Sequence, residues 1–249
     1  MKAHEQMIAT ALALVRRFVA GYSPSPPCVM LAGSRGRGTA KKNSDYDLVF
    51  LYPELPQGAW REMISYEGAD LEIFAHDLRS LQYFLREIER PSGEASLACM
   101  VAEGISIHSA NSELESKAKD IAREFLASGP EPLDDAKSSQ RRYAITDLAE
   151  MLNSADSPAQ RIAIGSALYS ALGGFALSAN GRWMASGKAL PPALRHFSPS
   201  LELEFTEAFE NLYASGNDSL LQKLVDDILK PFGGRLRGGF RQQAPASWR

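Results

Sequence analysis

The stretch that decides the fold is LAGSRGRGTAKKNSDYDLVFLY, residues 31–52. It begins apolar, passes through a loop of three glycines and four cationic side chains, and ends in a run rich in strand formers. Asp45 and Asp47 stand at the start of that run. Burying even a mild polar group without a partner costs on the order of 2–7 kcal/mol. Two carboxylates in this position therefore indicate a functional site.

The spacing of these aspartates favours a metal site. Residues i and i+2 of a strand share a face, which puts Asp45 and Asp47 roughly 6–7 Å apart at Cα. Two Mg²⁺ ions about 3.5–4 Å apart fit between such carboxylates and serve phosphoryl chemistry. In the later strand ADLEIFAH, residues 69–76, Asp70 and Glu72 also share a face. Either one supplies a third carboxylate if the two strands pair.

The loop ahead of Asp45 has the composition of a phosphate cradle. Gly33 ends an apolar strand and allows the backbone to turn sharply towards a ligand. Ser34 follows with a hydroxyl and an N–H group, and four cations surround the loop: Arg35, Arg37, Lys41 and Lys42. Backbone N–H groups combined with cationic side chains bind phosphate oxygens, although a solvated loop is the preferred interpretation of any single one of these cations.

The segments AGS, ten intervening residues, DYDL and the later LEIF resemble the nucleotidyltransferase superfamily, whose fold is that of DNA polymerase β and kanamycin nucleotidyltransferase. By this resemblance Gly33 and Ser34 hold the triphosphate of ATP, with Arg35 nearest the phosphates. Asp45 and Asp47 ligate Mg²⁺ or Mn²⁺. Glu72 is preferred to Asp70 as the third ligand and base, because apolar residues flank it on both sides.

The rest of the chain predicts an α+β protein with a small mixed sheet followed by an all-helical bundle. Strands are expected at 28–33, 46–52, 69–76 and 104–109, and helices at 3–20, 78–90, 95–103 and 112–129. After residue 130 only helices are expected, at 136–154, 158–179, 199–214 and 217–230. The predicted domains are a nucleotidyltransferase domain, 1–130, and a helical domain, 131–249, with a flexible basic tail.

Two segments of the helical half carry cations of interest. GRWMASGKALP, residues 181–191, gathers Arg182, Trp183 and Lys188 in an apparent loop. Lys188 is predicted to reach the nucleotide across the domain cleft, and the alternative is a packing tryptophan with exposed cations. Arg141 and Arg142 are interpreted as surface ion-pair partners of Asp147 on one helix, with a binding role as the less favoured alternative.

Bulk properties narrow the function classes. The chain has 249 residues and a net charge of −3, so no global basic field favours nucleic acid. Cys28 and Cys99 have no metal spacing, and the four histidines do not cluster, which argues against zinc. With no signal peptide and no run of 18 apolar residues, a cytoplasmic protein without membrane contact is expected.

The resemblance implies transfer of a nucleoside monophosphate, AMP from ATP, to a hydroxyl with release of pyrophosphate. A small-molecule acceptor is favoured over protein or tRNA, because the chain lacks a basic stripe. Two alternatives stay open on the same fold: a non-catalytic nucleotide-binding regulator, and a partner module of the toxin–antitoxin type. The sequence also leaves the oligomeric state open.

Overall fold

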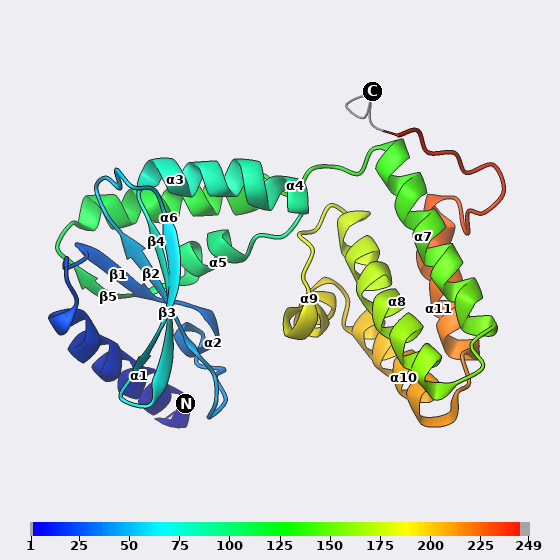
Figure 1. Cartoon of the computed structure of the whole chain (residues 1–249), viewed down its shortest axis with the longest axis horizontal. Helices are drawn as coiled ribbons and strands as arrows, with labels where there is room; N and C mark the ends of the chain where they lie inside the picture. Colours follow the sequence, from blue (N-terminus) through cyan, green and yellow to red (C-terminus); the bar gives the residue numbers. More distant parts are fainter. Residues whose placement is uncertain (1, 245–249) are drawn as a thin grey trace. The chain divides into compact units, whose positions relative to one another are not determined.

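The computed structural model describes residues 2–244, with side chains from residue 5 onward. The chain divides into two units, Met1–Gly129 and Pro130–Arg249, each with its own core. The first holds the sheet and the second is helical, as the α+β prediction requires (Figure 1). No helix in the described part of the chain is both long and apolar enough to cross a lipid bilayer.

The first unit is built on a five-stranded mixed sheet in the order β3-β4-β2-β1-β5. Strands β2 and β4 pair in parallel, and the other neighbours pair antiparallel. The strands are β1 (Cys28–Leu31), β2 (Tyr46–Leu51), β3 (Trp60–Tyr66), β4 (Ala69–His76) and β5 (Ile105–Ser109). The helices are α1 (Lys2–Gly21), α2 (Gly33–Gly36), α3 (Leu78–Tyr83), α4 (Arg90–Ser92), α5 (Ser96–Glu103) and α6 (Ser112–Ala127), with a π-helical turn, Phe84–Glu89, joining α3 to α4.

Helix α1 covers one face of this sheet, whereas α3 and α6 cover part of the other (Figure 1). The core under α1 includes Val15 and Phe18 of the helix and the alternate residues Leu48 and Phe50 of β2. Because successive strand side chains point to opposite faces, the residues that alternate with Leu48 and Phe50, Asp47 and Val49, face away from α1. The alternation of β2 thus determines the side on which the site lies.

Strand β3 is absent from the sequence prediction, which assigned no element to this part of the chain. It is the edge strand of the sheet and pairs antiparallel with β4. The hairpin turn uses Glu67 and Gly68 at φ 49° and 76°. Two consecutive positive φ values are typical of the type I′ turn that joins short hairpins. The strand matters because it carries Arg61 to the carboxylate cluster described below.

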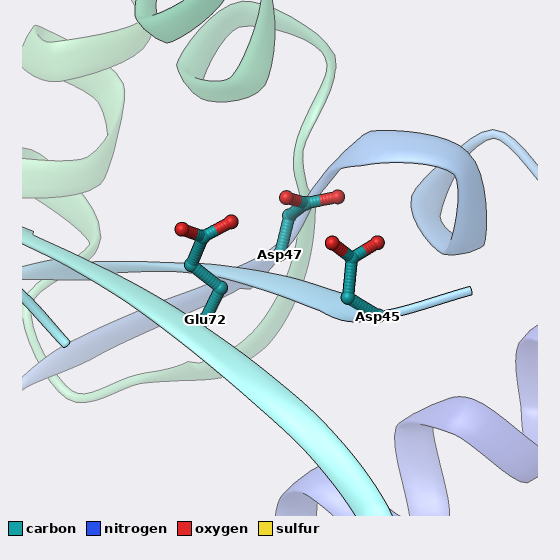
Figure 2. A group of neighbouring side chains, drawn as sticks. All are labelled: Asp45, Asp47 and Glu72. Carbon is teal, nitrogen blue, oxygen red and sulfur yellow. The ribbon is translucent and has the colours of Figure 1, made fainter. Parts of the chain in front are cut away.

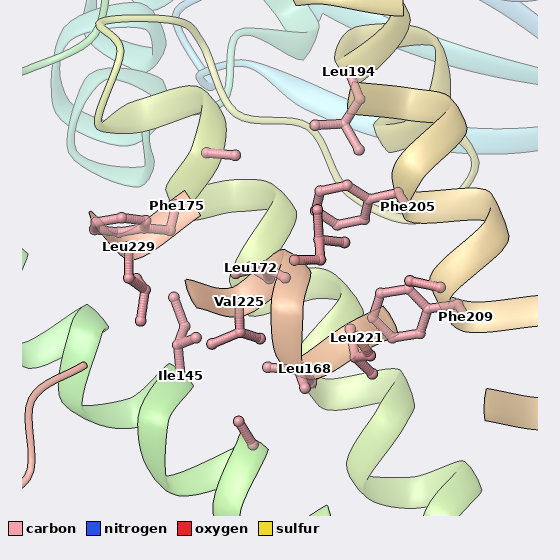
Figure 3. Packing of buried hydrophobic residues seen from close by; sticks show 14 of the residues in the cluster. Ile145, Leu168, Leu172, Phe175, Leu194, Phe205, Phe209, Leu221, Val225 and Leu229 are labelled. Atoms are coloured by element: carbon pink, nitrogen blue, oxygen red, sulfur yellow. The ribbon is translucent and has the colours of Figure 1, made fainter. Parts of the chain in front are cut away.

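In the described part of the helical unit, five α-helices pack around an apolar core. Figure 3 shows buried side chains of this core. The helices are α7 (Asp135–Asn153), α8 (Pro158–Ser178), α9 (Leu190–Phe197), α10 (Pro199–Ser215) and α11 (Ser219–Leu229). Helix α9 was not expected from the sequence; its Leu190 and Leu194 are buried in the common core. Leu172 and Phe175 of α8 and Phe205 of α10 are fully or almost fully buried at the centre.

The interpretation of Arg141 and Arg142 as ion-pair partners of Asp147 is wrong. Arg142 instead donates to the backbone carbonyls of residues 233–234, at 2.7 and 2.8 Å. Asp147 lies 3.6 Å from Arg237. Neither arginine is three or four residues from Asp147, the separations that bring helix side chains together, and this explains the difference.

The basic tail expected to be flexible packs against the helices where it is described. Phe240 stacks on Tyr143 of α7 at 4.1 Å between ring centroids, and Arg235 pairs with Asp226 of α11 at 2.7 Å. Residues 245–249, which end the expected tail, lie outside the described residues.

A buried histidine gives the first unit a testable pH dependence. His76, at the end of β4, is only 4% exposed, and burial lowers its pKa to about 4. The unfolded chain binds this proton near pH 6.5, so the free energy of unfolding should fall as the pH is lowered from about 6.5 to 4. A shift of this size corresponds to about 3 kcal/mol.

Urea unfolding of wild type and His76→Leu at several pH values measures this effect. The variant is expected to lose most of the slope between pH 6.5 and 4. Equal slopes in the two proteins would show that other groups cause the acid sensitivity.

Candidate active site

Three carboxylates converge on the face of the sheet opposite α1. Asp45 directly precedes β2, Asp47 lies within it, and Glu72 lies in the neighbouring β4. Ligand oxygens from all three lie within 4.8 Å of one another. Figure 2 shows the carboxylates rising side by side from the two strands. Asp45 and Asp47 are partly exposed, and Glu72 is 8% exposed.

The parallel pairing of β2 with β4 brings these residues together. Its register places Asp47 directly beside Glu72. Asp70, the alternative third acid, is instead opposite Ser65 of β3 and accepts a hydrogen bond from its hydroxyl at 2.9 Å. The structure therefore groups Glu72, and not Asp70, with the two aspartates. That Glu72 acts in the reaction stays a prediction.

Gly33 lies against the carboxylate of Asp47. Its φ is +59°, and a Cβ built on it would stand 1.7 Å from Asp47 Oδ2. The preceding N–H group, of Ala32, donates to the Asp47 carbonyl at 2.8 Å. The glycine is thus required both by its conformation and by the carboxylate that occupies the space of a side chain.

Ser34 presents a hydroxyl that the protein leaves unsatisfied. Its Oγ atom is buried and has no hydrogen-bond partner among the residues that the structure describes. Buried polar atoms in native proteins nearly always have a partner, and an exception calls for a physical explanation. A ligand oxygen at this position supplies one, which agrees with the expected contact to the triphosphate.

Arg35 has a different environment from the one expected. Its guanidinium donates to the carbonyl oxygens of Ser44 and Asp45, the latter at 3.1 Å, and lies over the Tyr46 ring at 3.8 Å from the centroid. These contacts fasten the end of the loop that presents Asp45. The phosphate contact stays a prediction, whereas the structure shows an arginine that holds a carboxylate-bearing segment in place.

Replacing Arg35 by glutamine is expected to weaken Mn²⁺ binding to the nucleotide-free protein about tenfold. Hydrogen bonds from charged groups contribute about 1.5–3 kcal/mol each, and their loss frees the backbone at Asp45. Mn²⁺ titration followed by electron paramagnetic resonance measures the change. Arg37→Gln is the matched control, because Arg37 pairs with Glu103 at the surface. If Arg35→Gln kept its Mn²⁺ affinity and lost only ATP affinity, Arg35 would be a phosphate ligand.

Arg61 of β3 is the site residue that sequence reasoning missed. Its Nε and Nη2 atoms both donate to Glu72 Oε1, and its guanidinium lies 5.1 Å from the Phe74 ring centroid. Three neighbouring carboxylates repel one another, and a cation beside them offsets part of that repulsion. The signal that reveals β3 is the alternating run 60–66 followed by the Glu67-Gly68 turn, which together indicate a hairpin.

The donor set fits a hard divalent cation. All three side chains offer carboxylate oxygens, which Mg²⁺ and Mn²⁺ prefer over nitrogen or sulfur ligands. The described residues contain this one group of three or more acidic, histidine or cysteine side chains close enough to share an ion. Asp45, Asp47 and Glu72 are therefore the residues that would hold it.

Lys188, predicted to bind the nucleotide, lies in the helical unit. It is exposed and belongs to a short 3₁₀ turn, Gly187–Ala189. Its contact with a nucleotide stays a prediction.

Comparison with known proteins assigns the fold that carries this site. Residues 22–92 match a protein family described as nucleotidyltransferase domain, and this segment contains the loop and all three carboxylates. This segment of the N-terminal unit thus belongs to the nucleotidyltransferase superfamily. Domains of this family transfer nucleotidyl groups, and the match therefore supports a transferase activity in general terms.

The solved structures that match include a nucleotidyltransferase-like protein from Exiguobacterium sibiricum. That match has 12% sequence identity, covers 88% of this chain and 70% of the other, and has a TM-score of 0.38. No curated protein matches the sequence.

Proposed function

We propose that the protein transfers AMP from ATP to a hydroxyl of a small-molecule acceptor and releases pyrophosphate. The observation that supports this most strongly is the convergence of Asp45, Asp47 and Glu72 beside Gly33 and the unsatisfied Ser34 hydroxyl. A protein that only bound nucleotide would need no third carboxylate.

The proposed reaction forms a bond between the acceptor oxygen and the α-phosphorus and breaks the bond from that phosphorus to the pyrophosphate oxygen. Gly33 and Ser34 hold the triphosphate, and Asp45 with Asp47 binds Mg²⁺ or Mn²⁺. When bound, the ion neutralises charge on the phosphates. Glu72 orients the acceptor hydroxyl and accepts its proton.

Two cationic side chains support this arrangement in the proposal. Arg61, paired with Glu72, keeps that carboxylate directed at the cluster. Lys188 is proposed to contact the nucleotide from the helical unit.

Transfer of label tests this function. The protein is incubated with Mg²⁺ and ATP labelled in the α-phosphate, together with a panel of hydroxyl-bearing small molecules, tRNA and protein lysate. We expect label on a small molecule and stoichiometric pyrophosphate. ATP labelled in the γ-phosphate is the control, because its label should appear in pyrophosphate alone. If the protein bound ATP but released no pyrophosphate in the presence of any acceptor, the result would support a nucleotide-binding regulator instead.

A further inference from the structure

Arg141 on α7 is a partly buried cation that lacks an anionic partner. One nitrogen, Nη1, donates to Ser178 Oγ at 2.7 Å and contacts Met184 Sδ at 3.1 Å. Ser178 itself is 6% exposed and donates to the Gly174 carbonyl at 2.8 Å. Among the described residues, no carboxylate lies within ion-pair distance of this guanidinium.

The other partly buried arginines of the chain are satisfied differently. Arg35, Arg90, Arg142 and Arg161 each donate to backbone carbonyl oxygens. Arg235 pairs with a carboxylate. Arg141 has one hydroxyl and one thioether, and a thioether is a weak acceptor. Most of the five N–H donors of Arg141 therefore have no strong acceptor among the described residues.

The Arg141 guanidinium is partly buried, and burial lowers its pKa from the usual value. None of its nitrogens is a buried atom without a partner, so the N–H groups that Ser178 and Met184 do not occupy are accessible to a ligand. The hydroxyl of Ser178 fixes one nitrogen, so that the guanidinium is oriented before any ligand arrives. The N–H groups of a guanidinium form a planar fork, and this geometry matches two oxygens of a phosphate or carboxylate group.

We propose that Arg141, held by Ser178 and Met184, is an oxyanion-binding residue of the helical unit. Its ligand is a molecule that carries a phosphate or carboxylate group, because the paired oxygens of these groups match the guanidinium. The site is distinct from the carboxylate cluster, which attracts phosphate only with a cation bound.

Anion titration without metal isolates this site. The full chain, treated with chelator, is titrated with pyrophosphate and, separately, with succinate, and binding is followed by tryptophan fluorescence and by equilibrium dialysis. Trp183 precedes Met184 and reports on the contact made by Arg141. The variants are Arg141→Gln and Arg141→Lys. The control is Arg161→Gln, because Arg161 on α8 donates to the Ala155 carbonyl.

We expect Arg141→Gln to weaken anion binding at least tenfold, Arg141→Lys to retain part of it, and Arg161→Gln to bind as wild type. Preference for pyrophosphate identifies a phosphate-bearing ligand, and preference for succinate identifies a carboxylate-bearing one. Because the titration contains no metal and measures no transfer, its outcome is independent of the transfer reaction. Unchanged affinity in Arg141→Gln, or no anion binding by wild type, would overturn the proposal.

Discussion

Replacing Asp47 by asparagine is expected to lower the rate of nucleotidyl transfer about a thousandfold. Asp47 follows Asp45 by two residues and lies directly beside Glu72 in the register of β2 with β4. Its carboxylate lies against Gly33. Asparagine keeps the shape and removes the charge that binds the cation. A bound cation contributes several kcal/mol to stabilising the transition state, and about 4 kcal/mol corresponds to a thousandfold in rate.

The assay is label transfer at saturating ATP, accompanied by thermal unfolding to show that the variant folds. Asp70→Asn is the matched control, because Asp70 lies on the same face of β4 and bonds Ser65 outside the cluster. It should transfer at the wild-type rate, whereas Glu72→Gln should bind ATP and lose turnover. An inactive Asp70→Asn beside an active Glu72→Gln would show that the third carboxylate is Asp70.

Gly33→Ala is expected to reduce transfer about a hundredfold and to lower the melting temperature by a few degrees. The new Cβ would stand 1.7 Å from Asp47 Oδ2, so the carboxylate must leave its position. The left-handed conformation adds roughly 1–2 kcal/mol of strain for a residue with a Cβ. The activity loss arises from the displaced carboxylate and the stability loss from both effects.

Gly58→Ala separates the effect of backbone strain from that of the clash with Asp47. Gly58 has φ +88°, and a Cβ there would meet nothing within 4 Å, so this variant carries backbone strain without a clash. We expect it to be destabilised and fully active. If Gly33→Ala transferred as fast as Gly58→Ala, the contact between Gly33 and Asp47 would have no bearing on the reaction.

The carboxylate cluster was predictable from sequence because its determinants are local. Strand alternation sets the face of Asp47 and Glu72, and the apolar runs around them indicate that both strands are central. Strand β3 gives a weaker signal, because as an edge strand it needs no continuous apolar face: Arg61 and Met63 are exposed, and Glu62 is only partly buried. The pairing of Arg61 with Glu72 could be found only once that strand was placed.

The environments of the arginines depend on contacts that no local pattern encodes. Arg35 was expected at the phosphates, and it reaches the Ser44 carbonyl because the loop turns back on itself. Arg141 meets Ser178, 37 positions away in the chain, through the packing of α7 against α8. A long, flexible side chain can reach several acceptors, and only the tertiary structure determines which of them lie nearby.

The most direct test of the carboxylate site is anomalous diffraction from crystals grown with Mn²⁺ and a non-hydrolysable ATP analogue. We expect an anomalous peak bound by oxygens of Asp45 and Asp47, at the distance of about 2.1 Å that small divalent ions adopt with oxygen ligands, with the triphosphate against Gly33 and Ser34. A nucleotide and its cation bound elsewhere, with all three carboxylates free of metal, would contradict the assignment.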